Sequence, residues 1–350
     1  MRPRSVLLIL ALQTILFLLA SSAAAEMLVV ANKAEATVSL IDLDSGKVTA
    51  TLPTGEGPHE VAVTADGQRA IVTDYGKGGS SRGSSLTLID LAKPSVLASI
   101  DLGDYTRPHG IAWLDDHRVV VTAEGAKAVI VVDTRSGKVL KAIDTDQEIS
   151  HMLALAPDGR RAFIANIGSH SITAVDLVAG KRLANVPTDR GAEGIAVSGS
   201  QVWVTNRAAD TVTVLDVDSL EKLAEFPSPG FPIRAVAAGD KILVTRARAG
   251  DMVIYDTAAL GTDALAEGRV LNFELEAKDV EDRLFGDRFG DSSVPIGIAV
   301  DPDGKRAWVA HANADVITEV DLGSGKTLRS LTAGREPDGM AYSSVVASAE

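Results

Sequence analysis

Apolar and polar residues alternate in short runs along most of this 350-residue chain, and the runs are rich in Val, Ile and Thr. One pattern recurs: a β-branched strand that ends in Asp and is closely followed by a tight turn. A repeat of roughly 40 to 45 residues built only from short strands is typical of a β-propeller with one four-stranded blade per repeat. The pattern therefore predicts an all-β fold of antiparallel blades. The strands end at Asp42, Asp90, Asp133, Asp176, Asp216, Asp256 and Asp321.

Each repeat opens on a strand of similar sequence, such as Pro295-Ile296-Gly297-Ile298-Ala299-Val300. A turn containing Asp and Gly leads to a second strand, because these residues supply the local hydrogen bond and the positive φ that tight turns need. A Gly-Lys turn then joins the third and fourth strands. The fifth position of the opening is mostly alanine, as expected where innermost strands converge on an axis.

The two ends of the chain together complete one blade. Residues 27–31 align with second strands, and residues 337–343 align with first strands. Pairing of the two segments would close the ring and leave no free sheet edge. We therefore expect seven blades in a single propeller domain that spans residues 26–350.

The repeats carry a strand-Asn-turn-strand-Asp motif that resembles a known family. Clear copies are Val204-Thr205-Asn206 with Val212-Thr213-Val214-Leu215-Asp216, and Ile164-Ala165-Asn166 with Ile172-Thr173-Ala174-Val175-Asp176. The motif is similar to the YVTN-type β-propeller repeats of YncE-like exported proteins, and the resemblance covers essentially all of the mature chain. It implies an extracytoplasmic binding or surface protein. Related propellers include lactonases, lyases and cofactor-bearing enzymes.

The first 25 residues predict a cleavable signal peptide. Arg2 and Arg4 precede an apolar run over residues 6–20, and Ala23-Ala24-Ala25 provides an A-x-A cleavage site. An uncleaved anchor is the alternative, but the run is short for a membrane span of about 20 residues. No other stretch is a candidate span, so the mature chain is expected in the periplasm or the medium.

The composition of the chain excludes several kinds of site and of binding partner. The chain has no cysteine, which excludes disulfides, thiol nucleophiles and Cys–zinc sites. Its 47 acidic and 34 basic residues give a net charge of −13. Such a surface repels phosphate backbones, so we expect no general nucleic-acid binding. The closed ring is expected to be monomeric.

Differences between the repeats gather at positions that an antiparallel blade places on one face of the disc, called the top face from here on. The second residue of the opening strand varies, and so does the end of the second strand. The predicted ligand-binding residues at the top mouth of the channel are His59, Asp74, His109, Glu124, His151, Glu193, Arg246, His311 and Asp338. Asn166 and Asn206 are interpreted instead as residues that satisfy turn backbone.

His59, His109 and His151 lie on consecutive blades and are flanked by carboxylates. Imidazole and carboxylate are suitable ligands for a divalent metal, with Glu124 and Asp74 completing the shell or orienting the histidines. The alternative is that each polar residue caps a loop and faces water. Arg234, Arg246 and Arg248 cluster in blade six and could receive an anionic group or pair with acidic neighbours.

Two insertions fall on the top side. Residues 76–85 are rich in Gly and Ser and predict a flexible loop in blade two. The blade-six insertion, about 276–293, has Val280, Leu284 and Phe285 at helical spacing, which predicts a short helix over 276–289 that covers the channel mouth. The alternative is that it only packs on the rim of blades six and seven.

The leading hypothesis is an exported binding protein with a small ligand, a metal or a protein partner at the top channel mouth. No catalytic residue is predicted. The alternative is a metal-dependent lactonase- or lyase-like enzyme, with His59, His109, His151, Glu124 or Glu193 near a Lewis-acid metal. A third possibility is a disc that only docks proteins. Gly323-Ser324-Gly325-Lys326-Thr327 mimics a phosphate-binding loop but lacks the required earlier glycine.

Overall fold

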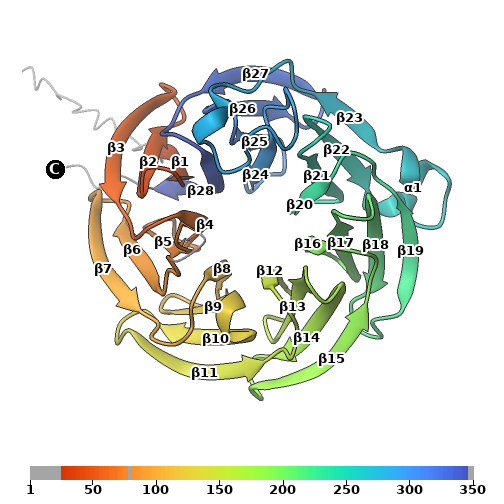
Figure 1. Ribbon diagram of the computed structural model, residues 1–350, viewed down its shortest axis with the longest axis horizontal. Coiled ribbons are helices and arrows are strands. Elements are labelled where there is room, and N and C mark those ends of the chain that lie inside the picture. The colour runs from red at the N-terminus through yellow and green to blue at the C-terminus, as the bar shows by residue number, and fades with distance from the viewer. Residues whose placement is uncertain (1–24, 78–80, 346–350) are drawn as a thin grey trace, which may run out of the picture.

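The computed structural model describes residues 25–77 and 81–345. Seven four-stranded antiparallel sheets surround a central axis, with one strand of each sheet innermost (Figure 1). The predicted all-β, seven-bladed propeller is therefore confirmed. The charged start and apolar run of the predicted signal peptide lie outside the described residues. No helix within the described part is long and apolar enough to cross a membrane.

The strands are given blade by blade, from the axis outward. Blade one consists of β28 (Pro337–Val345), β1 (Ala25–Asn32), β2 (Thr37–Asp42) and β3 (Lys47–Pro53), and blade two of β4 (Pro58–Val63), β5 (Arg69–Asp74), β6 (Ser85–Asp90) and β7 (Ser95–Asp101). Blade three consists of β8 (Pro108–Trp113), β9 (Arg118–Ala123), β10 (Ala128–Asp133) and β11 (Lys138–Asp144), and blade four of β12 (Ser150–Leu155), β13 (Arg161–Asn166), β14 (Ser171–Asp176) and β15 (Lys181–Pro187). Blades five to seven are β16 (Ala192–Ser198), β17 (Gln201–Asn206), β18 (Thr211–Asp216) and β19 (Lys222–Pro227); β20 (Pro232–Ala238), β21 (Lys241–Arg246), β22 (Asp251–Asp256) and β23 (Arg269–Asn272); β24 (Pro295–Val300), β25 (Arg306–His311), β26 (Val316–Asp321) and β27 (Lys326–Leu331).

The hydrophobic core lies between neighbouring blades. The two middle strands of each blade are buried on both faces, which explains their nearly continuous apolar runs, whereas the outermost strands have exposed residues. Trp203 and Trp308 are fully buried between blades, and each stacks on a tyrosine of the adjacent blade. Burial of these faces stabilises the ring without any covalent crosslink.

Blade one closes the ring as predicted. Strand β1 pairs with β28 from Ala25↔Val345 to Asn32↔Pro337, and with β2 along its other edge. The first and last strands of the domain are therefore neighbours in one sheet.

The innermost strands share an irregularity at the top face. In β4 the register against β5 shifts between Pro58 and Val61, and corresponding shifts occur in the other innermost strands. In blades two, three and five a threonine hydroxyl of the second strand accepts a hydrogen bond from the backbone N–H that the shift frees, as from Glu60 N to Thr73 Oγ1 at 2.9 Å. Such bulges re-aim side chains. Here they release the second residue of each innermost strand from the ladder and, except in β20, the third residue as well.

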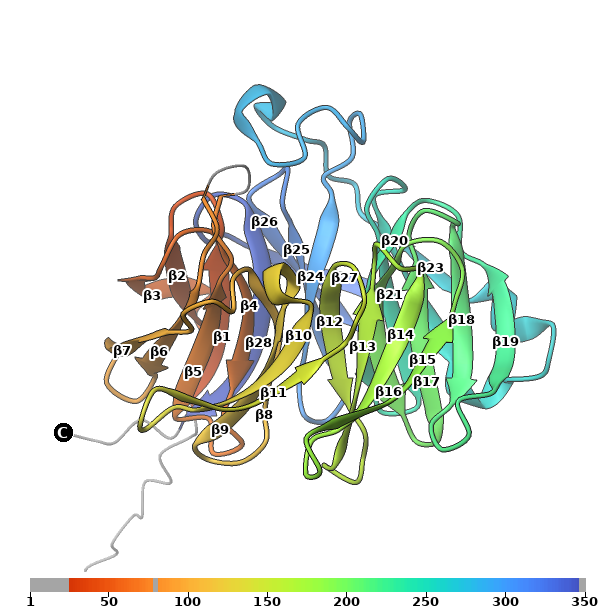
Figure 2. The ribbon, with the colours of Figure 1, turned by 60° about the horizontal axis from the view of Figure 1, so that its bottom comes forward.

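The blade-six insertion follows β23 and stands above the top face (Figure 2). The helix predicted over 276–289 is wrong, because only a 3₁₀ turn forms at Val280–Asp282. Asp279 and Gly286 adopt φ values of 44° and 52°, so the backbone leaves the right-handed helical region on both sides of this turn. A second insertion, between β22 and β23, contains the one-turn helix α1 (Ala264–Glu267). The predicted 76–85 loop falls between β5, which ends at Asp74, and β6, which begins at Ser85, and its residues 78–80 lie outside the described residues.

Candidate metal site at the channel mouth

The three predicted histidines meet at the top of the channel. Each is the second residue of an innermost strand, β4, β8 or β12, at the bulge described above. The ring centroids of His59 and His109 are 3.9 Å apart, those of His109 and His151 are 3.5 Å apart, and those of His59 and His151 are 6.2 Å apart. The bulges of three consecutive blades thus bring the imidazoles into one stack.

His109 lies at the centre of this stack and is fully buried. Neither of its ring nitrogens has a hydrogen-bond partner among the described residues. Burial, together with the neighbouring His151 and His59, lowers the pKa of His109 well below its usual value, so the ring is neutral. An unsatisfied buried polar group lowers the stability of the folded state by about 1–3 kcal/mol. A ligand that binds to a His109 nitrogen would offset this loss.

His59 presents one nitrogen to a carboxylate. Its Nδ1 lies 3.0 Å from Asp338 Oδ2 and 3.6 Å from Glu60 Oε1. Burial lowers the pKa of His59 to about 4 although Asp338 opposes this shift, so the ring is neutral near pH 7. Asp338 also lies 3.0 Å from Lys33 Nζ. With Nδ1 facing a carboxylate, Nε2 is the nitrogen left for a metal, as in carboxylate–histidine–metal arrangements.

His151 differs because both of its nitrogens face carboxylates. Nδ1 contacts Glu124, and Nε2 lies 3.2 Å from Glu193 Oε1. Burial disfavours the charged ring, but the two carboxylates outweigh it and raise the pKa of His151. Glu124 also accepts a hydrogen bond from Tyr75 Oη at 2.6 Å, and Glu193 pairs with Arg207 at 2.6 Å.

Glu60 and Arg234 form an ion pair across the channel, between β4 of blade two and β20 of blade six. Burial raises the pKa of Glu60 to about 7, despite Arg234. The sequence analysis missed Glu60 and did not place Arg234 in the site. Both occupy the third position of the opening, which is glycine where the neighbouring strand comes close: a Cβ at Gly339 would lie 2.1 Å from the His59 carbonyl oxygen. Departure from that glycine was the available signal.

Each acidic group of the cluster has a basic partner. The carboxyl groups of Glu60, Glu124, Glu193 and Asp338 face Lys33, Arg207, Arg234 and His151. Buried charges are retained only when they are paired in this way.

Glu124 does not occupy the position that the alignment of repeats assigned to it. Ala123 is the last residue of β9 and pairs with Ala128, whereas Asn32 and Asp74 hold this place in their own blades. Glu124 is the next residue, equivalent to Lys33, Tyr75 and Arg207. The backbone N–H of each of these four residues donates to a carbonyl oxygen just before the adjacent innermost strand, at 3.0–3.2 Å. All four side chains reach the histidine and carboxylate cluster.

The structure does not bring Asp74, Arg246 and His311 together with the histidines. Each ends a second strand and binds a residue of the third strand in its own blade, and none lines the channel-mouth pocket. Asp74 accepts hydrogen bonds from Ser85 at 2.7 Å and Thr87 at 2.9 Å, as His311 Nε2 contacts Thr318 at 3.0 Å. Asn166 and Asn206 make the same kind of bond in their blades, to the hydroxyl groups of Thr173 and Thr213 and not to the turn backbone that the sequence predicted.

A pocket of about 560 Å³ opens above the cluster. One wall is polar and includes His59, His151, Glu193 and Arg207. The lining also includes Ile233 and Ile296 at the second positions of β20 and β24, and Asp282, Leu284, Phe285 and Arg288 of the blade-six insertion. The insertion therefore covers the mouth, as predicted, but as an irregular loop.

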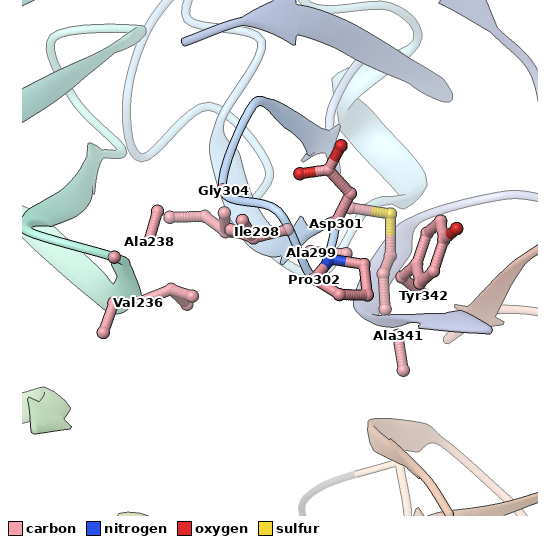
Figure 3. Close-up of a pocket in the computed structure, with 13 residues that line it drawn as sticks. Val236, Ala238, Ile298, Ala299, Asp301, Pro302, Gly304, Ala341 and Tyr342 are labelled. Carbon is pink, nitrogen blue, oxygen red and sulfur yellow. The ribbon is translucent and has the colours of Figure 1, made fainter. Parts of the chain in front are cut away.

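A second pocket, of about 410 Å³, lies at the opposite ends of β20, β24 and β28 (Figure 3). Its one charged side chain, Asp301, is already used, because it accepts hydrogen bonds from the backbone N–H groups of Lys305 and Arg306 and faces the Arg306 guanidinium at 3.2 Å. The titratable groups are thus concentrated at the top end of the channel.

Three groups of side chains have ligand atoms within 4.8 Å of one another. One of them, Asp115, Asp116 and His117, lies in the turn between β8 and β9. The other two are at the channel mouth: His59, Glu60 and His109, and His109, Glu124 and His151. Tetrahedral zinc with bonds of about 2.0–2.2 Å needs ligand atoms roughly 3.3 Å apart, so small side-chain rotations would suffice in either group. His109 belongs to both.

Comparison with known proteins finds no matching family model and no matching curated protein. Solved structures do match. The structure of apo AztD from Citrobacter koseri has 12% identity and a TM-score of 0.59, covering 91% of this chain and 97% of that chain. The dihydro-heme d1 dehydrogenase NirN in complex with DHE has 15% identity and a TM-score of 0.62, covering 91% of this chain and 75% of that chain. The resemblance to YVTN repeats stays a prediction. What the comparisons and the structure share is the fold, the seven-bladed β-propeller.

Proposed function

We propose that this protein is a binding protein that takes one divalent transition-metal ion, with Zn²⁺ as the reference ion, at the histidine stack. The observation that carries the proposal is His109, a neutral and fully buried imidazole whose two nitrogens have no partner among the described residues. It lies in contact with two other histidines and near carboxylates. Imidazole with carboxylate is a donor set that suits zinc and its neighbours in the first transition series.

His59, Glu60 and His109 are the favoured ligands. His59 is neutral, and Asp338 faces its Nδ1 and leaves the other nitrogen for the ion. His151, in contrast, has both nitrogens engaged by Glu124 and Glu193. Glu60 would exchange part of its contact with Arg234 for the ion. Because His59 lines the pocket, the remaining coordination position would face that pocket.

Export by the predicted signal peptide would place this site outside the cytoplasm, in a monomeric ring. The enzymatic alternative, a lactonase- or lyase-like propeller, would use the same ion as a Lewis acid. It requires a substrate at the open coordination position, and no side-chain arrangement favours it over binding alone. Binding is therefore the function that the geometry supports best.

The test compares two identical substitutions, His109→Asn and His311→Asn. Both histidines are buried, but His311 belongs to blade seven and contacts Ser293 and Thr318. Asn already occupies the position of His311 in three blades, so that variant is a folded control. Calorimetric titration of metal-free protein with Zn²⁺ should give one ion per chain. His109→Asn should weaken binding at least about 100-fold, since even outer-shell changes cost 10–100-fold.

His311→Asn should bind Zn²⁺ like the unmodified protein. Saturating Zn²⁺ should also raise the unfolding temperature of the control and not that of His109→Asn, because a ligand stabilises only the state that binds it. The proposal fails if the unmodified protein binds no stoichiometric Zn²⁺, or if both variants bind it equally.

A further inference from the structure

Three arginines converge on one aromatic ring beside the pocket. The guanidinium carbons of Arg207, Arg248 and Arg288 lie 5.4, 5.3 and 5.2 Å from the centroid of the Phe231 ring. Arg288 is also 5.2 Å from the centroid of Phe289, and the two phenylalanine rings are 4.9 Å apart. The arginines come from three separate segments: the residue after β17, the residues after β21, and the blade-six insertion.

The positive charge there exceeds its local compensation. Arg207 pairs with Glu193 at 2.6 Å, and Arg248 lies 3.7 Å from Asp210 in a solvent-exposed pair. Arg288 forms no ion pair with any carboxylate in the described ranges. Cation–π contact offsets part of the cost of gathering three cations, but each would gain more from an anion held between them.

The excess charge faces the pocket. Arg207 and Arg288 both line it, whereas Arg248 stacks on the same ring but does not. Arg335 lines it as well and donates only to the backbone carbonyl of Asp282, at 3.0 Å. An anion that enters the pocket therefore meets two or three guanidinium groups, and planar guanidinium matches carboxylate in a bidentate geometry.

The pocket also has an apolar wall. Ile233 and Ile296 contribute to it from the innermost strands, and Phe285 and Leu284 contribute from the insertion. Leu284 is 55% exposed, so this insertion leaves a large apolar side chain uncovered at the pocket edge. A small inorganic anion would leave this wall in contact with water. The volume of about 560 Å³ falls in the range of pockets that hold small organic molecules.

We propose that this pocket binds an organic carboxylate with an apolar body. The carboxylate lies between Arg207 and Arg288, and the apolar body packs on Ile233, Ile296 and Phe285. This inference goes beyond the metal site and does not require a bound ion.

The test uses 2-naphthoate as the probe and its uncharged counterpart, 2-naphthalenemethanol, as the matched ligand. Binding is measured by calorimetry on metal-free protein from which the chelator has been removed. The unmodified protein should bind naphthoate saturably and more tightly than the alcohol. Arg288→Gln should weaken naphthoate binding by about tenfold or more, the usual effect of losing a charge-assisted hydrogen bond. The affinity of Arg288→Lys for naphthoate should lie between that of the unmodified protein and that of Arg288→Gln.

Arg248→Gln is the matched control, because it removes the same charge from the same ring outside the pocket. It should change the affinity for naphthoate by less than about threefold, as expected for a solvent-screened charge. The inference is overturned if the alcohol binds as tightly as naphthoate, if naphthoate does not bind at concentrations up to about 10 mM, or if both arginine variants lose affinity equally.

The His109→Asn variant separates this inference from the metal site. It should keep naphthoate binding in the absence of metal. If the unmodified protein binds no Zn²⁺, the metal proposal alone is rejected. If it binds naphthoate no more tightly than 2-naphthalenemethanol, the carboxylate proposal alone is rejected.

Discussion

The mouth of the channel has a polar half and an apolar half, although both are built from the same backbone position. Blades one to five place Asp338, His59, His109, His151 and Glu193 at the second residue of the innermost strand, and blades six and seven place Ile233 and Ile296 there. The bulge that frees this residue occurs in both halves. Side-chain chemistry alone therefore makes one half a candidate ligand shell and the other a hydrophobic support.

The two halves depend on different forces. Paired charges hold the polar half, in which His109 remains unsatisfied. The apolar half is held by burial, since Phe289 and Val294 of the insertion pack with Ile233 and Ile296 in one cluster. The comparison suggests that the apolar half positions the insertion and the polar half selects the ligand. Three substitutions test this division.

The largest effect is expected in the polar half, from Asp338→Asn. This carboxylate faces His59, Lys33 and Arg234, and although burial opposes it, His59 and Lys33 hold its pKa well below the usual value. Neutralising it leaves Lys33 without its carboxylate and Arg234 with Glu60 alone, which should lower the free energy of unfolding by about 3–5 kcal/mol. Urea unfolding at neutral pH measures this loss. A loss below about 1 kcal/mol would mean that charge pairing does not hold this half.

An intermediate effect is expected in the apolar half, from Ile296→Ala. Ile296 is 2% exposed, and truncating a buried isoleucine to alanine costs about 2–4 kcal/mol. Because no metal-ligand candidate lies in this half, the affinity for Zn²⁺ should stay within a few-fold. Paired urea unfolding and Zn²⁺ titration measure both quantities. Strong loss of Zn²⁺ affinity by a folded variant would show that the two halves are not separable.

The smallest effect, and the opposite sign, is expected for Asp74→Asn. Asp74 is as buried as Asp338 but has only hydroxyl partners, and burial raises its pKa from 3.8 to about 6 although hydrogen bonds from Ser85 and Thr87 oppose this. The folded state thus holds the Asp74 proton more tightly than the unfolded state. The contribution of Asp74 to the free energy of unfolding is therefore fully present below about pH 4. It decreases as the pH rises toward 6 and is lost at pH 7, where the buried carboxylate is charged.

Asp74→Asn should therefore stabilise the protein by about 1–3 kcal/mol at pH 7.5, with little gain at about pH 4. The asparagine can donate to the same hydroxyl groups, as Asn166 does to Ser171 and Thr173. Differences in unfolding free energy between variant and unmodified protein at the two pH values test the sign. An equal gain at both would attribute the effect to hydrogen bonding and not to the buried charge.

The fold could be predicted because every blade packs against its neighbours in the same way. The residues that form its strands and turns therefore recur along the sequence. The helix over 276–289 could not, because periodicity at Leu284 and Phe285 reports only which side chains face apolar neighbours. Asp279 and Gly286 have positive φ angles, which interrupt a right-handed helix and which the spacing of apolar residues does not encode.

The site could be predicted where residues depart from the repeat at the second position. The role of Asp74 was misjudged because its departure from Asn preserves hydrogen bonding to Ser85 and Thr87 on the neighbouring strand. Glu124 was assigned to the wrong position in the repeat because Ala123 fills the usual place of Asn. Glu60 and Arg234 meet across the ring, and an alignment of repeats contains no information about which blades face each other.

Closure of the ring also determines when, during synthesis, the closing sheet and the channel mouth can form. Strand β1 is synthesised first, and its inner edge stays unpaired until β28 arrives roughly 300 residues later. Asp338 is part of that last strand and supplies the carboxylate that faces His59. A chain that stops short of β28 therefore lacks both a closed sheet and a complete channel mouth, so the ability to bind would report that the last strand of the ring has paired.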